Sequence, residues 1–177
     1  MSMNTVPERL AALRAAMAAN GVAVYLIPVG DPHASEYLPA HYTSLTWFSG
    51  FHGENSNLVV TRTGSALWAD GRYFVQAEKE LAGTEIELQR MGEPGVPTVE
   101  EYCGKVLPEN GVLGLCGLTA SCGLVRGVQK ELDAKKGTIK TLNLEDELWT
   151  EGRPARPATP AWILPKEYAE QGVGLIL

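Results

Sequence analysis

Apolar side chains follow two different spacings over the first thirty residues. Val6, Leu10, Leu13 and Met17 recur at steps of three and four. This spacing predicts an amphipathic helix. Thr5 suits the N-cap of this helix, and Gly21 suits its end. A continuous apolar run over residues 22–27 follows, and its β-branched and aromatic content predicts a buried strand.

Turn-forming residues mark the next segment. Asp31 suits an N-cap, so we expect a short helix from His33 to Leu38 that ends before Pro39. The segment 45–51 is rich in aromatic residues and bounded by glycine, so it predicts neither a helix nor a strand. This part of the chain therefore predicts the order helix, strand, helix over the first forty residues.

A β-hairpin is expected near the middle of the chain. Two apolar stretches, residues 57–61 and 65–69, flank the turn sequence Arg62-Thr63-Gly64. Asp70-Gly71 then interrupts the apolar pattern, and a helix is expected over residues 72–81.

The second half of the chain repeats the alternation of strands and helices. Strands are expected at 85–89, 112–116 and 138–142, and helices at 98–106 and 121–135. Each of these helices begins at a Thr or Ser that can cap it. Strands alternating with helices, together with one antiparallel hairpin, predict an α/β fold with a mixed sheet.

Composition adds limits on the class of protein. The 177 residues include 15 basic and 21 acidic side chains, a formal charge of -6, and 45% are hydrophobic. This describes a globular domain, and it argues against a nucleic-acid partner because no cationic cluster is present. No apolar run reaches the 18 residues of a membrane helix, and the N-terminus lacks the pattern of a secretory signal. We therefore expect a cytoplasmic protein with no membrane partner.

Composition changes after Trp149. Three prolines fall within seven residues, Pro154 to Pro160, which favours an extended spacer over packed structure. We expect a folded domain at residues 1–150, an interdomain linker at 151–165 and the incomplete start of a following domain at 166–177. The chain would then be the first domain of a longer protein, and an intact mass of about 19 kDa for the native gene product would contradict this.

Few residues suggest catalysis or metal binding. Asp31, His33 and Glu36 are ligand-type residues, but their spacing lacks an i, i+4 pair that would direct two side chains to one ion. Neither His33 nor His52 belongs to a nucleophile motif. The three cysteines show no Cys-x-x-Cys spacing and are expected to be free thiols. We predict no catalytic residue and no metal site.

Arg72 is the candidate binding residue. It follows the expected turn at Asp70-Gly71, near the end of the predicted sheet, where α/β proteins often place binding groups. Its guanidinium suits bidentate binding of a carboxylate. The alternative is an architectural ion pair with Asp70, and the sequence leaves both roles open.

Four segments, in order, resemble one family. They read Asp-Pro-His-Ala-Ser-Glu-Tyr at 31–37, Trp-Phe-Ser-Gly-Phe-His-Gly at 47–53, Trp-Ala-Asp-Gly-Arg-Tyr-Phe-Val-Gln-Ala at 68–77, and Leu-Trp-Thr-Glu-Gly-Arg-Pro at 148–154. Together they resemble the N-terminal domain of X-prolyl aminopeptidase (aminopeptidase P), in the creatinase/prolidase superfamily. The resemblance covers about residues 6 to 165.

The resemblance implies more than the pattern does. It implies a mixed, roughly six-stranded sheet flanked by helices. It also implies a noncatalytic role for this domain, at the substrate entrance and in subunit contacts. The family's enzymes remove the residue that precedes proline, using two manganese ions bound in a C-terminal domain absent from this chain. The expected partners are a peptide with proline at its second position, the protein's own C-terminal domains and a second subunit in a homodimer. The family's substrate-contacting arginine corresponds to Arg72.

One segment departs from the family pattern. Gly-Phe-His-Gly-Glu-Asn-Ser at residues 50–56 replaces the usual Gly-Phe-Asp/Thr-Gly-Ser-Ala-Gly, so charged and amide side chains stand where small ones are common. Two alternatives stay open for the function. The chain could be a stand-alone interaction or regulatory module, or it could belong to a creatinase-like or prolidase-like hydrolase.

Overall fold

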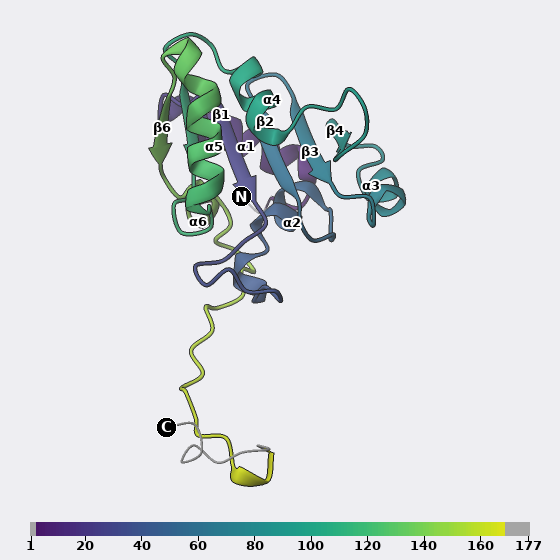
Figure 1. Cartoon of the computed structure of the whole chain (residues 1–177), viewed down its shortest axis with the longest axis vertical. Coiled ribbons are helices and arrows are strands. Elements are labelled where there is room, and N and C mark those ends of the chain that lie inside the picture. The colour runs from purple at the N-terminus through teal and green to yellow at the C-terminus, as the bar shows by residue number, and fades with distance from the viewer. Residues whose placement is uncertain (1–2, 169–177) are drawn as a thin grey trace.

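A six-stranded mixed sheet forms the centre of the domain (Figure 1). The structure, a computed structural model, describes residues 3–168. The strand order is β4-β3-β2-β1-β5-β6. The strands are β1 Val24–Pro28, β2 Asn57–Thr61, β3 Ser65–Ala69, β4 Ile86–Arg90, β5 Val112–Leu115 and β6 Thr138–Thr141. Only β2 runs antiparallel to its neighbours, through the predicted hairpin with β3, and the predicted mixed α/β sheet is confirmed.

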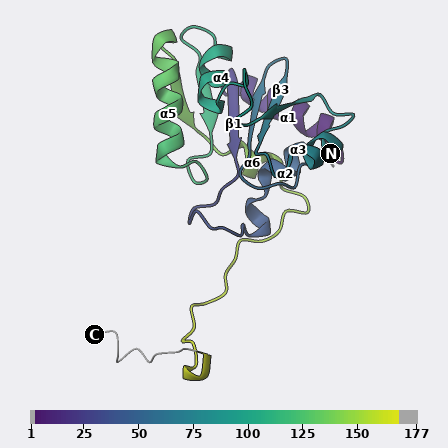
Figure 2. The same ribbon diagram turned by 45° about the vertical axis from the view of Figure 1, so that its right-hand side comes forward.

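Helices cover both faces of the sheet (Figures 1 and 2). They are α1 Val6–Ala19, α2 Ser44–Ser49, α3 Phe74–Glu80, α4 Val99–Val106, α5 Cys122–Leu132 and α6 Leu144–Leu148, with 3-10 turns η1 Ala40–Tyr42, η2 Asp133–Lys135 and η3 Lys166–Tyr168. α4 and α5 pack on one face, and α1, α2, α3 and α6 pack on the other. Within residues 3–168, no helix is both long and apolar enough to cross a bilayer.

Burial on both faces explains why β1 is a continuous apolar run. All five of its residues are buried. Val24 and Leu26 belong to the core under α4 and α5, whereas Tyr25 and Ile27 belong to the core on the opposite face. Successive side chains of a strand point to opposite faces, so a central strand covered on both sides needs no polar positions.

Capping side chains fix the starts of the long helices. The Thr5 hydroxyl accepts from the N–H of Glu8, and the Glu8 carboxylate accepts from the N–H of Thr5. Thr98 and Glu101 form the same reciprocal pair at α4. The predicted starts of these two helices are therefore confirmed, since each pair satisfies two N–H groups that lack a partner within the helix.

The predicted helix from His33 to Leu38 is wrong. Oδ1 of Asp31 accepts from the N–H of His33 at 2.9 Å and of Ser35 at 3.0 Å, which is the bonding of a side-chain-closed turn. Ala34 has φ 52°, a left-handed conformation that a helix cannot contain. The residue types of an N-cap and of such a turn are the same, so the sequence did not separate them.

Other elements differ in extent or were missed. The helix expected over 72–81 begins at Phe74, because the preceding residues form a turn in which the Tyr73 N–H donates to the Asp70 carbonyl. The unassigned segment 45–51 contains most of α2. α6 was not predicted at all.

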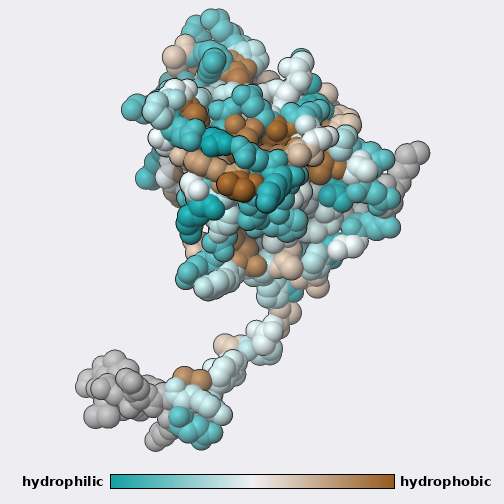
Figure 3. All heavy atoms as spheres, turned by 90° about the vertical axis from the view of Figure 1, so that its right-hand side faces the viewer, coloured by the Kyte–Doolittle hydropathy of each residue, from teal (hydrophilic) through white to brown (hydrophobic). Residues whose placement is uncertain are grey.

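The segment after α6 leaves the domain as an extended chain. Residues 153–165 contain no helix or strand, and all of them except Arg153 are exposed. Figure 3 shows this segment projecting from a surface that is mostly hydrophilic on the side in view. Part of the expected following domain, residues 169–177, lies outside the described residues. The proposed boundaries at residues 150 and 165 stay predictions.

Candidate functional site

A crevice opens where β1 and β5 end. These two parallel strands are neighbours, but the chain after β1 leads to α2 on one face and the chain after β5 leads to α5 on the other. The two loops therefore diverge at the carboxyl edge of the sheet, which is where open α/β sheets bind ligands. The cavity between them has a volume of about 700 Å³.

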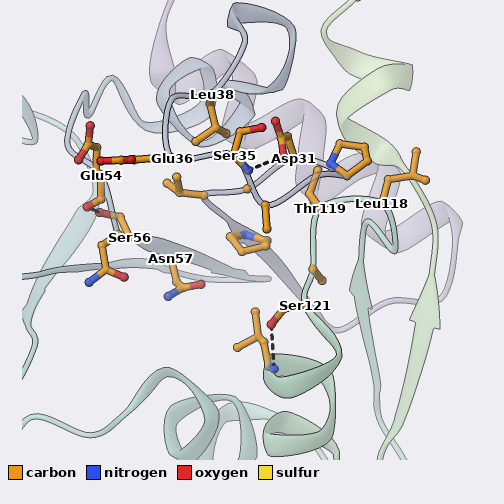
Figure 4. Close-up of a pocket in the computed structure, with 18 of the residues that line it drawn as sticks. Asp31, Ser35, Glu36, Leu38, Glu54, Ser56, Asn57, Leu118, Thr119 and Ser121 are labelled. Carbon is orange, nitrogen blue, oxygen red and sulfur yellow. Dashed lines mark hydrogen bonds between the residues drawn. The ribbon is translucent and has the colours of Figure 1, made fainter. Parts of the chain in front are cut away.

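Four loops line this crevice (Figure 4). They follow β1, precede β2, follow β3 and follow β5, so all reach the same edge of the sheet. The polar side chains among the lining residues are mostly small or acidic and include Asp31, Ser35, Glu36, Glu54, Asn55, Ser56, Asn57, Arg72, Thr119 and Ser121. In Figure 4, Glu36, Glu54 and Asn57 lie across the cavity from Leu118 and Thr119.

Gly30 allows the first and last of these loops to approach closely. A Cβ atom at this position would lie 2.6 Å from the backbone oxygen of Thr119. That oxygen belongs to backbone, which cannot move aside as a flexible side chain can. The absence of a side chain at Gly30 therefore allows the loops after β1 and β5 to meet at the crevice.

Asp31 has a local structural role. Its carboxylate accepts from the backbone N–H of Ser35 and of His33, and these bonds hold its pKa below the usual range. Its Oδ2 atom is buried and has no hydrogen-bond partner among the described residues. His33 and Glu36 are exposed, and residues 3–168 contain no group of three His, Cys, Asp or Glu side chains placed to hold a metal ion.

Arg72 is oriented by Asp70. Nε of Arg72 lies 3.1 Å from Oδ1, and Nη2 lies 2.7 Å from Oδ2 of the Asp70 carboxylate. Hydrogen bonds from Arg72 lower the pKa of Asp70 to about 2. The arginine side chain is 64% exposed, lines the crevice, and has no hydrogen bond at Nη1 within the described part of the chain. The ion pair with Asp70, the alternative that the sequence left open beside the binding role, is present, and it leaves one nitrogen able to bind a ligand.

The segment that departs from the family pattern lies beside Arg72. Glu54, Asn55 and Ser56 line the crevice, and the Tyr73 hydroxyl donates to Oε2 of Glu54 at 3.3 Å. The N–H of His52 donates to Glu80, its ring lies 3.3 Å from the same carboxylate, and His52 is not among the residues that line the crevice. The unusual side chains of this segment therefore contribute acidic and amide groups to the crevice.

A buried Tyr–Glu pair, which sequence reasoning missed, lies away from the crevice. The Tyr25 hydroxyl is 2.5 Å from Oε2 of Glu145 and accepts from the N–H of Leu144 at 3.2 Å. Burial raises the pKa of Glu145 to about 7 and also raises the pKa of Tyr25. The pair joins β1 to α6 and is structural.

The cysteines are free thiols, as predicted. Cys103 and Cys116 are buried and Cys122 is exposed. Burial raises the pKa of Cys103 to about 12 and raises that of Cys116, so neither buried thiol is activated as a nucleophile.

Comparison with known proteins identifies related chains. Residues 9–148 match the model of the Creatinase/Prolidase N-terminal domain. Aminopeptidase P2 of Arabidopsis thaliana is 38% identical over 170 residues, which is 93% of this chain and 24% of that protein. A probable Xaa-Pro aminopeptidase P of Pyrenophora teres is 36% identical over 167 residues, 93% of this chain and 25% of that protein. The chain thus spans about a quarter of the length of these relatives.

Solved structures share the fold. An X-prolyl aminopeptidase of Caenorhabditis elegans, described as a cytosolic enzyme with a di-nuclear active site, superposes with a TM-score of 0.78 at 32% identity, over 86% of this chain and 26% of that one. The N-terminal domain of the cytoplasmic peptidase PepQ of Mycobacterium tuberculosis superposes with a TM-score of 0.57 at 23% identity, over 79% of this chain and 97% of that one. The second likeness supports the fold alone.

Proposed function

The chain belongs to the creatinase/prolidase N-terminal domain family, and from that premise we propose that it is the noncatalytic N-terminal domain of an X-Pro aminopeptidase. Such an enzyme removes the N-terminal residue that precedes proline. The observation that carries the proposal is identity of 34–38% with aminopeptidase P relatives over more than nine-tenths of the chain.

The reaction itself is assigned to residues outside this chain. The worm relative is described as having a di-nuclear active site. The described residues offer no set of ligands for even one metal ion, so they do not fit that centre. We propose that two manganese ions are held by C-terminal domains of the same protein.

Arg72 is proposed to contact the substrate. Asp70 holds two of its three guanidinium nitrogens, so the side chain is preorganised, and Nη1 is left to donate to a peptide carboxylate or carbonyl. The crevice beside it is open to solvent and is lined by both polar and apolar side chains, which suits a surface that a peptide passes. A cytoplasmic location and a homodimer complete the proposal.

The activity is tested on protein expressed from the whole native gene. Hydrolysis of an Arg-Pro-Pro peptide is measured beside an X-Pro dipeptide and creatine. We expect cleavage of the Arg–Pro bond of the longer peptide. Preference for the dipeptide or for creatine would favour the prolidase-like or creatinase-like alternative, and no metal-dependent hydrolysis would favour the stand-alone module.

The role of Arg72 is tested in the same protein. Arg72→Ala is expected to lower kcat/KM about 10- to 100-fold, the range for loss of a hydrogen bond to a charged group. Arg62→Ala is the matched control, because Arg62 is an exposed arginine in the β2–β3 turn at the opposite edge of the sheet. Unchanged kcat/KM in a normally folded Arg72→Ala protein would remove the substrate role.

A further inference from the structure

His41 joins the domain to the chain that leaves it. The residue lies in η1, between β1 and α2, and is buried at 9% exposure. Its two ring nitrogens and its carbonyl all contact residues more than 100 positions later in the sequence. These contacts lie at the start of the Pro-rich segment that follows α6.

The contacts of His41 define its protonation state. Nδ1 lies 2.8 Å from the carbonyl oxygen of Pro154, and Nε of Arg156 lies 3.2 Å from Nε2 of the ring. A carbonyl oxygen only accepts, so Nδ1 must carry a hydrogen. An arginine Nε–H only donates, so Nε2 must be unprotonated. Both bonds form only with the neutral Nδ1–H tautomer.

Asp146 completes the connection from α6. Its carboxylate pairs with Nη1 of Arg153, and its Oδ2 lies 3.0 Å from Nη2 of Arg156. Nε of Arg153 donates to the His41 carbonyl at 3.1 Å, and its guanidinium stacks over the Trp149 ring at 5.1 Å. Arg153 is thus fixed by contacts that do not depend on the imidazole ring.

Beyond Arg156 these connections end. Among the described residues, no hydrogen bond or ion pair links residues 157–168 to the folded domain. The last described residue with a hydrogen bond or ion pair to the folded domain is therefore Arg156. This residue lies well inside the segment expected to be a linker from residue 151.

We propose that His41, Asp146, Arg153 and Arg156 form a pH-sensitive clamp that fixes residues 153–156 on the domain and places the interdomain hinge after Arg156. When His41 is neutral, all four residues are joined. Protonation of the ring puts a hydrogen on Nε2, so the Arg156 contact becomes two donors facing each other and two positive charges meet. Arg153 stays in place, whereas Arg156 keeps only its solvent-exposed ion pair with Asp146, and its arm is released.

The charged groups around His41 determine what protonation of its ring does to the clamp. From η1 the ring faces Tyr42, whose ring centroid is 4.8 Å away, and from the Pro-rich segment it faces Arg153 and Arg156. From α6, Asp146 is engaged by both arginines, and Glu145 is bonded to Tyr25. A protonated His41 would be a third cation beside one carboxylate that already has two partners, so no free carboxylate beside the ring, within residues 3–168, would offset its repulsion of Arg156.

The clamp is tested by NMR relaxation on the whole 177-residue chain, without reference to enzyme activity. At pH 8 we expect amide order parameters of about 0.85 at Arg153 and Arg156 and below about 0.6 at Ala158. At pH 5 the value at Arg156 is expected to fall below about 0.6 while Arg153 is unchanged. Imidazole nitrogen spectra should show the Nδ1–H tautomer at pH 8.

Two variants distinguish the titration of His41 from other effects of acidic pH on the chain. His41→Asn keeps a donor toward the Pro154 carbonyl and cannot titrate, so the order parameter at Arg156 should no longer change with pH. His33→Asn, at an exposed histidine outside the clamp, should behave as wild type. An Nε2–H tautomer in the wild-type chain, or an Arg156 amide equally mobile at both pH values, would overturn the proposal even if His41→Asn failed to fold.

Discussion

Nη2 of Arg72 lies 2.7 Å from Oδ2 of Asp70, across the turn that joins β3 to α3. The Asp70 carboxylate also accepts from the backbone N–H of Arg72 and from the Asn55 side chain. The turn, the arginine and the loop before β2 are therefore held by one carboxylate. This arrangement presents Arg72 to the crevice in a fixed orientation.

The pKa of Asp70 measures the interaction between the Asp70 carboxylate and the Arg72 guanidinium. Arg72→Ala removes the main cause of its depression, so we expect the pKa of Asp70 to rise from about 2 toward its ordinary value, as measured by carboxyl carbon NMR. Because the folded-state pKa is depressed, the stability from this pair is complete above the ordinary aspartate pKa and is lost as pH falls toward 2. Arg62→Ala should leave the Asp70 titration unchanged, and a pKa that stays near 2 in Arg72→Ala would contradict the assigned cause.

Glu145 should change the free energy of unfolding with pH in the direction opposite to the change that Asp70 causes. Its folded-state pKa of about 7 is above the ordinary value of 4.5, so the folded state holds the proton more tightly than the unfolded state. The free energy of unfolding should therefore decrease as pH rises from 4.5 to 7, by up to about 3 kcal/mol relative to Glu145→Gln. Urea unfolding over this pH range measures the difference between the two proteins. Glu147→Gln, at an exposed position of the same helix, should follow the wild-type curve; a wild-type curve parallel to that of Glu145→Gln would rule the effect out.

Removal of the Tyr25 hydroxyl tests the polar contacts of the same pair. Tyr25→Phe leaves the Leu144 N–H and the Glu145 carboxyl without their buried partner. We expect a loss of about 1–3 kcal/mol in the free energy of unfolding, measured by denaturant titration. Tyr37→Phe is the control, because Tyr37 is 79% exposed. Equal stability of the two variants would mean that the hydroxyl contributes nothing.

The close approach of the loops after β1 and β5 depends on Gly30. Gly30→Ala would place a methyl group 2.6 Å from the Thr119 backbone oxygen, so the loops after β1 and β5 must separate. We expect destabilisation of about 1–3 kcal/mol, as for other overpacked sites, together with amide shift changes at Thr119. Gly64→Ala, where the nearest atom is 3.9 Å away, should change neither. Normal stability and an unshifted Thr119 amide in Gly30→Ala would show that the approach is looser than the structure indicates.

Much of the fold could be predicted because the hydrophobic pattern matches which residues are buried and because capping residues mark where helices begin. β1 is apolar throughout because helices cover both of its faces, and the Thr–Glu pairs at α1 and α4 mark helix starts in any context. The helix expected after Asp31 failed because the same residue type closes a turn, and only the left-handed Ala34 distinguishes the two. All six strands were expected from the hydrophobic pattern alone, and the family resemblance implied the same number.

The candidate site was predictable in part. Arg72 was found because a strand-ending Asp-Gly turn places the next side chain at the edge of the sheet. Glu145 was not, because its acidic surroundings in the sequence are typical of an exposed helix, and its burial depends on Tyr25, 120 residues away. His41 shows the same limit, since its partners Pro154 and Arg156 come from the other end of the chain.

The proposed noncatalytic role of this chain in an X-Pro aminopeptidase can be tested in one comparison. The purified 177-residue chain and the protein expressed from the whole native gene are each assayed with manganese on an Arg-Pro-Pro peptide. We expect release of arginine by the whole-gene product and none by the 177-residue chain. Release of arginine by the chain alone, or none by the whole-gene product, would contradict the proposed noncatalytic role.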